Sequence, residues 1–334
     1  MKKIFTLISV AFVAMSVNAQ STESFVAVDA DGNLASQFAD VVSTQDGKTA
    51  TNVVNGNSIV MFSTTNVEVE AVGSAEPAAL DKGEDLTIGA SIGENRYEYT
   101  INSSKQITWQ TANQGDISYN YVKGTGKPAV SAYAEEILTD GAPTGAYRLA
   151  YVAFDPATGG LPITGLYYKI TTKAAGALKV GIWGNKGNHP TYLVDAETKQ
   201  VSNFLVEGYI NGQNGADGKK KWLTNAEIAQ IHTDLNQTNP YVIGGGNQPF
   251  WGNVIFDTAA NKTYYLFQGT TQIGFQGYTF APGKSKEDML TGIEAVKAVA
   301  EQNADAPVYN LSGQQVSKDY KGVVIQNGVK RIQK

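Results

Sequence analysis

Residues 254–280 read VIFDTAANKTYYLFQGTTQIGFQGYTF and contain three short strand patterns. These are an apolar run, an aromatic run and a returning alternating run, at 254–256, 264–267 and 273–280. In the returning run, Ile273 and Phe275 share one face of a strand. Tyr278 and Phe280 share the other face, so the phase changes after Phe275, which indicates a β-bulge. The stretch predicts the closing strands of an antiparallel β-sandwich.

The same two-residue period recurs along much of the chain. Val67, Val69 and Ala71 alternate with glutamates, which predicts a strand with one face in water. Gly93-Glu94-Asn95 separates two further runs, as the turn of a hairpin does. Strands do not alternate with helices in the manner of a parallel sheet. The expected fold class is all-β, an antiparallel β-sandwich or jelly roll with one short inserted helix and a small C-terminal β tail.

The inserted helix is predicted to follow Thr224. Thr224 and Glu227 stand three residues apart, the spacing of a capping box. One helical stripe is then formed by Ile228, Ile231, His232 and Leu235. Long polar loops flank this segment, at 208–222 and 237–252. Loops on a rigid sandwich frequently carry the binding function.

The composition excludes several classes of protein. The chain has no cysteine, which excludes disulfides, cysteine metal sites and an acylated cysteine anchor. Its net charge is −5, so there is no basic field for nucleic acid. The two histidines limit histidine-based catalysis and metal sites, and no metal or other cofactor is expected. The acidic cluster after Asp29 lacks the glycine of a calcium loop, so an Asp-Gly turn is the favoured interpretation.

The first nineteen residues have the pattern of a secretory signal peptide. Two lysines precede an apolar stretch, and Val17-Asn18-Ala19 matches a cleavage site. The apolar stretch is shorter than the about 20 residues of a membrane-spanning helix, and no transmembrane segment is predicted. We expect an exported protein at the outer-membrane surface or outside the cell. The predicted parts are the signal peptide 1–19, a sandwich region 20–282 in which 20–124 is alternatively a separate N-terminal sheet, a linker 283–305 and the C-terminal β tail 306–334.

The C-terminal tail, residues 307–334, reads PVYNLSGQQVSKDYKGVVIQNGVKRIQK. Its pattern has three parts: an apolar-Tyr-Asn-Leu-x-Gly strand at 308–316, a Lys-Gly with an apolar run at 321–325, and a basic end. This pattern resembles the C-terminal tails of exported proteins from Bacteroidetes-type bacteria, which are related to the type IX secretion sorting domain. Val324 and Val329 depart from it, where such tails often have Tyr and Lys. The resemblance implies contact with the export machinery, through a working export signal, or else a small stalk domain.

Residues from about 163 to 280 are similar to non-catalytic sandwich modules in secreted proteins of the same bacteria. The matching pieces are short, at 162–170, 176–180, 261–265 and 277–280. Such modules often accompany polysaccharide-degrading domains. The resemblance implies a jelly-roll scaffold and a carbohydrate ligand, although a fold by itself does not establish function.

Exposed aromatic rings are the expected glycan contacts, because a ring can stack on the apolar C–H face of a sugar. The candidates are two loop tryptophans, a strand tyrosine and nearby polar side chains: Trp222, Trp251, Tyr192, Asn247, Gln248 and Lys220. For the tryptophans, the alternative is that they anchor their loops. For the run Lys219–Lys221, the alternatives are an acidic polysaccharide ligand and a solvated loop tip. Trp109 is expected in the core, and Trp183 either between the sheets or in solvent.

These observations favour a secreted or cell-surface, non-catalytic protein that binds a polysaccharide or other glycan through aromatic stacking. The alternative is a structural or adhesive surface protein that binds protein partners. A third interpretation is a polysaccharide-acting enzyme, with strand-end acids at Asp155, Asp195, Glu207 and Asp257. A glycosidase needs two carboxylates about 5 to 10 Å apart, and the sequence contains no distances between these acids.

Overall fold

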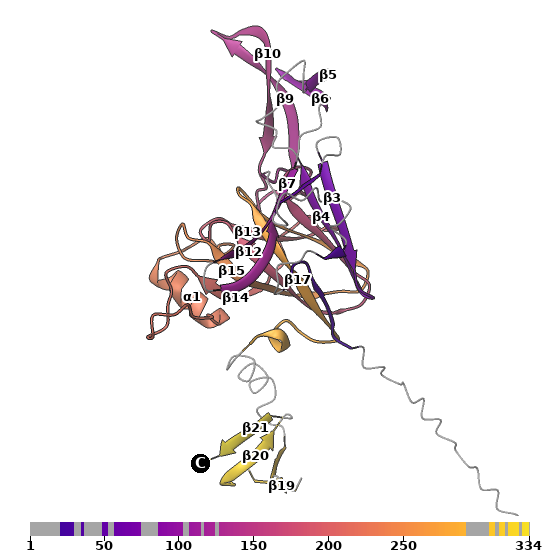
Figure 1. Ribbon diagram of the computed structural model, residues 1–334. Coiled ribbons are helices and arrows are strands. Elements are labelled where there is room, and N and C mark those ends of the chain that lie inside the picture. Colours follow the sequence, from indigo (N-terminus) through magenta and orange to yellow (C-terminus); the bar gives the residue numbers. More distant parts are fainter. Residues whose placement is uncertain are drawn as a thin grey trace, which may run out of the picture.

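The structure is a computed structural model, and it describes residues 21–29, 35–36, 49–52, 57–74, 86–102, 107–114, 117–123, 127–291, 307–310, 314–317, 320–326 and 329–333. Side chains are not described at 49–52, 57–58, 74, 107–114, 117–120 and 325–333. The prediction of an all-β, sandwich-like fold is confirmed, because antiparallel sheets make up most of the described chain (Figure 1). The predicted signal peptide and the linker after residue 291 lie outside the described residues.

Sheet A has eight strands in the spatial order β14, β15, β12, β17, β8, β7, β2, with β1 paired to β17. The strands are β1 Glu23–Val26, β2 Thr49–Asn52, β7 Ile107–Gln114, β8 Ile117–Lys123, β12 Gly176–Gly184, β14 Leu205–Ile210, β15 Phe250–Thr258 and β17 Ile273–Pro282. In β17, Gly277 pairs with Gly181, but Phe275 pairs with the next residue of β12. Gln276 is therefore an extra, bulged residue, and the predicted change of phase in this strand is confirmed.

Sheet C packs against sheet A and has the order β13, β16, β11, β4, β3. Its strands are β3 Asn57–Ser63, β4 Val67–Ser74, β11 Tyr167–Thr172, β13 Thr191–Asp195 and β16 Lys262–Gln268. Val67, Val69 and Ala71 are buried and alternate with half-exposed glutamates, as predicted. The two sheets enclose one apolar core, which includes Leu178, Val180, Phe256 and Phe280 from sheet A and Tyr168, Ile170 and Leu266 from sheet C. Burial of each such side chain stabilises the fold by about 1.5–3 kcal/mol.

The described strands within residues 20–124 do not form a sheet of their own. β1 and β8 pair with β17, while β3 and β4 extend sheet C through β11. The separate unit is sheet D, with the order β10, β9, β6, β5 and the strands β5 Leu86–Gly93, β6 Arg96–Ile101, β9 Ser131–Thr139 and β10 Ala142–Val152. Sheet D rises above the sandwich in Figure 1 and has a small apolar core of its own. The alternative of a separate N-terminal sheet is wrong, because strand partners depend on tertiary contacts that alternation does not encode.

The inserted helix α1 spans Asn225–Asp234. The Thr224 hydroxyl accepts a hydrogen bond from the Glu227 backbone N–H, and the Glu227 carboxylate accepts one from the Thr224 backbone N–H. Ile228 is buried in the main core, but Leu235 is 55 % exposed, so the predicted stripe is buried only at its start. The helix ends at Asp234, and Leu235 is its C-cap residue.

The chain after β17 continues along sheet A instead of leaving it. The short 3₁₀ turn η3, Glu287–Met289, lies against β12. Lys286 forms an ion pair with Asp257 at 2.6 Å, and its backbone N–H donates to the same carboxylate at 2.7 Å. Residues 283–291, predicted as the start of the linker, are therefore held on the sandwich.

The C-terminal tail forms a four-stranded sheet with the order β19, β18, β20, β21. Its strands are β18 Val308–Asn310, β19 Gln315–Val316, β20 Gly322–Gln326 and β21 Val329–Gln333. The predicted small β tail is thus present. In the described part of the chain, no helix has both the length and the apolar character needed to cross a membrane.

Candidate functional site

The outer face of sheet A, which is turned away from sheet C, carries the candidate site. Since side chains alternate along each strand, the register decides which outward residues are neighbours. One line of Cα partners across β14, β15, β12 and β17 is here called the indole row: Tyr209, Trp251, Trp183 and Gly274. The adjacent outward line is here called the central row: Glu207, Asn253, Gly181 and Gly277. Aromatic rings therefore lie directly beside polar and glycine positions.

The indole row is completed by a ring from β8. Tyr121 and Trp183 are stacked, with ring centres 4.8 Å apart and an interplanar angle of 9°. Tyr121 lies over Gly274, where a Cβ would come within 2.6 Å of the tyrosine ring. Trp251 and the half-buried Tyr209 extend the same cluster across β15 and β14. A glycine in β17 thus makes room for a continuous aromatic layer on the outside of the sheet.

The structure brings three of the predicted site residues together. Lys220 Nζ lies 5.7 Å from the centre of the Trp251 ring. Trp222 packs edge to face against Tyr209, with ring centres 5.0 Å apart. Trp251 is only 3 % exposed, so it is not the open stacking ring that we predicted. The exposed aromatic surface belongs instead to Trp222 and Tyr209, which are half-buried.

The other three predicted residues lie elsewhere. Asn247 and Gln248 are exposed in the loop before β15, where the Gln248 side chain accepts a hydrogen bond from Asn211 Nδ2 at 3.0 Å. Tyr192 is buried on sheet C, with its ring centre 4.7 Å from that of Phe154. Its assignment to the same site as Trp251 is corrected, because β13 and β15 belong to different sheets.

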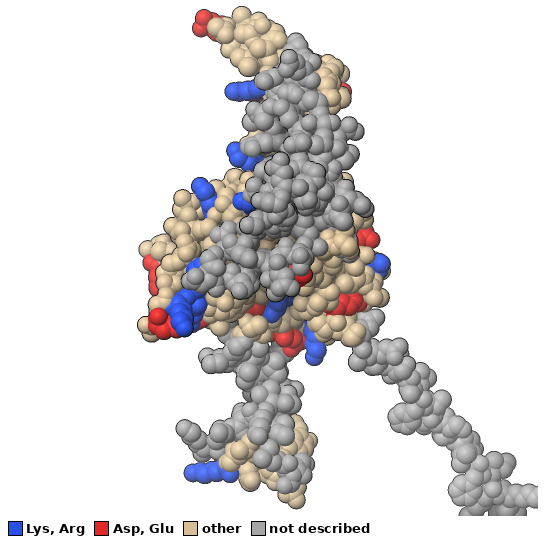
Figure 2. Space-filling model, viewed as in Figure 1, with Lys and Arg blue, Asp and Glu red and all other residues tan. Residues whose placement is uncertain are grey.

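The lysine run at 219–221 lies in the loop before α1. Lys221 forms an ion pair with Glu227 of the helix, and the Lys219 backbone N–H donates to Asp217 at 3.1 Å. Figure 2 shows acidic and basic side chains scattered over the visible face, with no large area of one sign among the described residues. The run is therefore partly neutralised, and Lys220 is the member that contacts the indole row.

Glu207 in the central row is a fully buried carboxylate with four hydrogen-bond donors. Its Oε1 accepts from Lys179 Nζ at 2.9 Å and from Asn253 Nδ2 at 3.0 Å. Its Oε2 accepts from the backbone N–H and the hydroxyl of Thr291, at 2.8 and 2.6 Å. Burial raises the pKa of this carboxyl, but the hydrogen bonds from Thr291 and Lys179 outweigh burial and hold the pKa below its ordinary value. Glu207 is therefore ionised at neutral pH and poorly suited to donate a proton.

Thr291 connects the central row to Trp222. The Trp222 indole N–H donates to the Thr291 hydroxyl at 3.1 Å, and that hydroxyl donates to Glu207. Trp222 therefore anchors the end of the 283–291 segment while part of its ring stays exposed. Both interpretations of this tryptophan, loop anchor and ligand contact, are compatible with its position.

A shallow hollow of about 260 Å³ opens beside the central row. Its lining includes Lys179, Asn253 and the bulged Gln276. One Lys179 proton is directed at Glu207, which leaves two donors, and Asn253 keeps its amide oxygen. The Gln276 side chain makes no hydrogen bond to the described residues. The hollow is smaller than the about 300–1,000 Å³ of pockets that enclose a small molecule, so it suits a ligand that lies along the surface.

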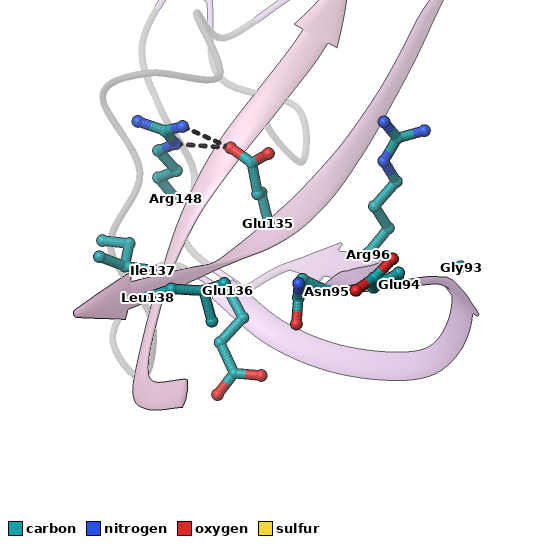
Figure 3. Close-up of a pocket in the computed structure, with 9 residues that line it drawn as sticks. All are labelled: Gly93, Glu94, Asn95, Arg96, Glu135, Glu136, Ile137, Leu138 and Arg148. Atoms are coloured by element: carbon teal, nitrogen blue, oxygen red, sulfur yellow. Dashed lines mark hydrogen bonds and ion pairs between the residues drawn. The ribbon is translucent and has the colours of Figure 1, made fainter. Parts of the chain in front are cut away.

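A second hollow, of about 630 Å³, lies on sheet D (Figure 3). Arg148 and Glu135 form an ion pair there at 2.6 Å, and Arg96 is the Cα partner of Glu135 on the neighbouring strand. Figure 3 shows these three side chains on the same side of the strands. Opposite charges alternate along this line, and exposed pairs of this kind contribute little free energy. Acidic and basic side chains thus both line this hollow.

Sequence reasoning missed Lys123, Lys179, Asn253 and Gln276 as residues of the site. A signal for Lys179 was present, because it interrupts an apolar period-two run in β12 and so faces outward. No comparable signal places Lys123 of β8 beside Trp183 of β12, because β17 lies between these two strands.

Comparison with known proteins assigns no family. No protein-family model matches the chain, no curated protein matches it, and no solved structure matches it. The resemblances to exported Bacteroidetes-type proteins therefore stay predictions. Among the described residues, no three His, Cys, Asp or Glu side chains gather as metal ligands do.

Proposed function

We propose that this chain is a secreted or cell-surface, non-catalytic protein that binds a glycan on the outer face of sheet A. The observation that carries the proposal is that half-buried aromatic rings and a polar hollow share this one surface. A sugar offers an apolar C–H face to a ring and hydroxyl groups to amides and ammonium groups. Trp222 and Tyr209 supply the first kind of contact, and the hollow supplies the second.

The two parts of the site are connected through Glu207. Lys179 and Asn253 donate to it from the hollow, and Thr291 donates to it from the side of Trp222. These bonds hold the side chains in place before a ligand arrives. A preorganised surface loses less conformational entropy on binding, which favours affinity.

The acids of this face support a non-catalytic role. A glycosidase requires two carboxylates, one of which donates a proton. The described lining of the hollow contains no carboxylate, and Glu207 beside it is ionised and receives four hydrogen bonds. The hollow therefore offers binding groups without an acid and base pair in its described lining.

A glycan array combined with a reducing-sugar release assay tests the proposal, with the chain lacking residues 1–19. Binding without release of sugar is expected. Gln276→Ala should weaken the affinity about 5- to 10-fold, the loss of about one hydrogen bond. Gln230→Ala on the exposed side of α1 is the matched control and should leave the affinity unchanged.

Trp222→Ala should weaken binding at least as much, and Tyr265→Ala, a half-buried ring on sheet C, is its control. Full affinity in both Trp222→Ala and Gln276→Ala would remove this site. Release of sugar by the wild-type chain would overturn the non-catalytic assignment.

The second candidate function is a structural or adhesive role through sheet D. Its edge strand β5 reads LTIGASIG, without a charge or a proline, and Ile92 in it is 54 % exposed. The unpaired backbone groups of such an edge can pair with a strand of another chain. Light scattering should then show an assembly that Ile92→Lys disrupts. Ile163→Lys, at an equally exposed position outside the sheets, is the control, and a monomer at high concentration speaks against this function.

A further inference from the structure

Two buried N–H groups of the indole row have no hydrogen-bond acceptor among the residues that the structure describes. They are the Nε1 groups of Trp183 and Trp251, which are 4 % and 3 % exposed and are cross-strand partners in β12 and β15. Leaving a buried donor unpaired costs about 1–3 kcal/mol. Buried polar groups in folded proteins are nearly always paired, so two neighbouring exceptions require a specific explanation.

Two lysine ammonium groups lie over the same two rings. Lys123 Nζ is 4.9 Å from the centre of Trp183, and Lys220 Nζ is 5.7 Å from the centre of Trp251. Burial lowers the pKa of Lys123, so its charge is poorly solvated in this position. Within the described chain, no carboxylate forms an ion pair with Lys123. The indole row thus combines two positive charges with two unpaired N–H donors.

The carboxylate of the adjacent central row does not neutralise these charges. Glu207 already accepts from Lys179, Asn253 and Thr291. Its lowered pKa reflects these partners, with Lys179 as the only lysine among them. Among the described residues, Lys123 Nζ faces the Trp183 ring, and a ring face attracts a cation less strongly than a desolvated anion does.

We infer that the indole row and its two lysines form an anion subsite, and that the glycan bound on this face carries a carboxylate or a sulfate group. The inference rests on the proposed function, because it names the ligand class of the same face. A carboxylate has about four lone-pair sites, enough for both N–H groups and both ammonium groups. Lysine side chains are long and flexible, so they can leave the ring faces and pair with the anion while the stacked rings stay in place.

Polymer pairs that differ only in charge test the inference. Polygalacturonate is compared with its methyl ester for the carboxylate, and dextran sulfate with dextran for the sulfate, using the chain without residues 1–19. We expect at least 10-fold tighter binding of the charged member of one pair, and the pair that responds identifies the anion. The affinity should fall with added salt, as expected when charges pair at a surface.

Four variants separate the parts of the subsite. Trp183→Phe and Trp251→Phe keep an aromatic ring but remove the N–H donor, and each should weaken binding of the charged polymer about 3- to 10-fold. Lys123→Gln should weaken it similarly and reduce the salt dependence. Lys173→Gln, at an exposed position of the loop after β11, is the control and should change neither. Circular dichroism and thermal unfolding establish that each variant is folded.

The indole N–H signals supply a measurement that does not depend on a variant's affinity. In ¹H–¹⁵N spectra, the Trp183 and Trp251 signals are identified by their loss in the two phenylalanine variants. Adding trigalacturonate or a sulfated oligosaccharide should shift both signals, and the neutral oligosaccharide should not. Unchanged signals with a saturating charged oligosaccharide would overturn the subsite.

Failure of this inference differs from failure of the proposed function. Equal binding of neutral and charged polymers, with binding still weakened by Gln276→Ala, overturns the anion subsite and leaves the glycan site standing. An absence of binding to every polymer overturns both. Tight binding of charged polymers that the Trp→Phe variants and Lys123→Gln do not alter places the anion elsewhere on the chain and also overturns the subsite.

Discussion

The inner and outer faces of sheet A consist of the same strands but differ in their chemistry. In β15, Val254 and Phe256 face sheet C and are completely buried among apolar side chains. Trp251 and Asn253 precede them in the opposite phase of the same strand, so they face outward, in the indole row and the central row. The inner face is apolar throughout this region, while the outer face holds a buried carboxylate, two unpaired N–H donors and a polar hollow.

This difference separates the source of stability from the source of binding. Apolar burial between the sheets stabilises the fold at about 25 cal/mol for each Å² removed from water. That free energy permits the outer face to keep groups that are costly in a folded protein, because the net stability is a small difference between large terms. Changes on the inner face should therefore act on unfolding, and changes on the outer face mainly on binding.

The largest expected effect is on the inner face. Phe256→Ala should lower the free energy of unfolding by about 3–5 kcal/mol, because it opens a cavity in the core. Urea denaturation measures the change, and Phe256→Leu should cost clearly less because it keeps most of the volume. A loss below about 1 kcal/mol for the alanine variant would mean that the sheets do not share one close-packed core.

Glu207→Ala should give the largest loss of stability on the outer face, about 2–3 kcal/mol. The substitution leaves the Lys179 ammonium group without its carboxylate partner and removes the acceptor of the Thr291 hydroxyl. The loss should be smaller than that of a fully buried ion pair, since the Lys179 side chain is 17 % exposed. Glu197→Ala removes an exposed pair with Lys262 and is the matched control, with about 0.5 kcal/mol or less expected. Equal losses in the two variants would contradict the anchoring role of Glu207.

The same carboxylate should contribute a pH-dependent part of the stability. Its pKa is lower in the folded chain than its ordinary value of 4.5, so folding favours the ionised form. The contribution is complete above pH 4.5 and is lost as the pH falls through the lower, folded pKa. Glu207→Gln should flatten the decline of stability as the pH falls below 4.5, measured by urea denaturation. A decline as steep as that of the wild type would show that other carboxylates dominate it.

The smallest effect is expected in sheet D. Arg148→Ala removes the ion pair with Glu135, in which the arginine side chain is 69 % exposed. The free energy of unfolding should change by about 0.5 kcal/mol or less, because water and salt screen such pairs. Thermal unfolding at two salt concentrations checks this, and a loss above about 1 kcal/mol would show that sheet D depends on its polar face.

Local patterns sufficed for much of the fold. Alternation placed Val67 and Val69 on a buried face, the phase change located the bulge at Gln276, and the capping box located the start of α1. Each of these features depends on residues that lie close together in the sequence, within a single strand or within one or two turns of a helix. The site was only partly predictable: Trp222, Trp251 and Lys220 were named and do lie together, whereas Tyr192 lies on the other sheet.

The sequence by itself determined that this is a chain of antiparallel strands with one capped helix, because side-chain period and turn chemistry act over a few residues. Only the tertiary structure decided which strands are partners. The pairing of β17 with β1, β8 and β12 brings segments at least 89 residues apart onto one sheet (273 − 184 = 89 for the nearest pair). It also decided that Lys123 lies over Trp183 and that Thr291 returns to Glu207. Such contacts follow from sheet register and close packing, which no local pattern contains.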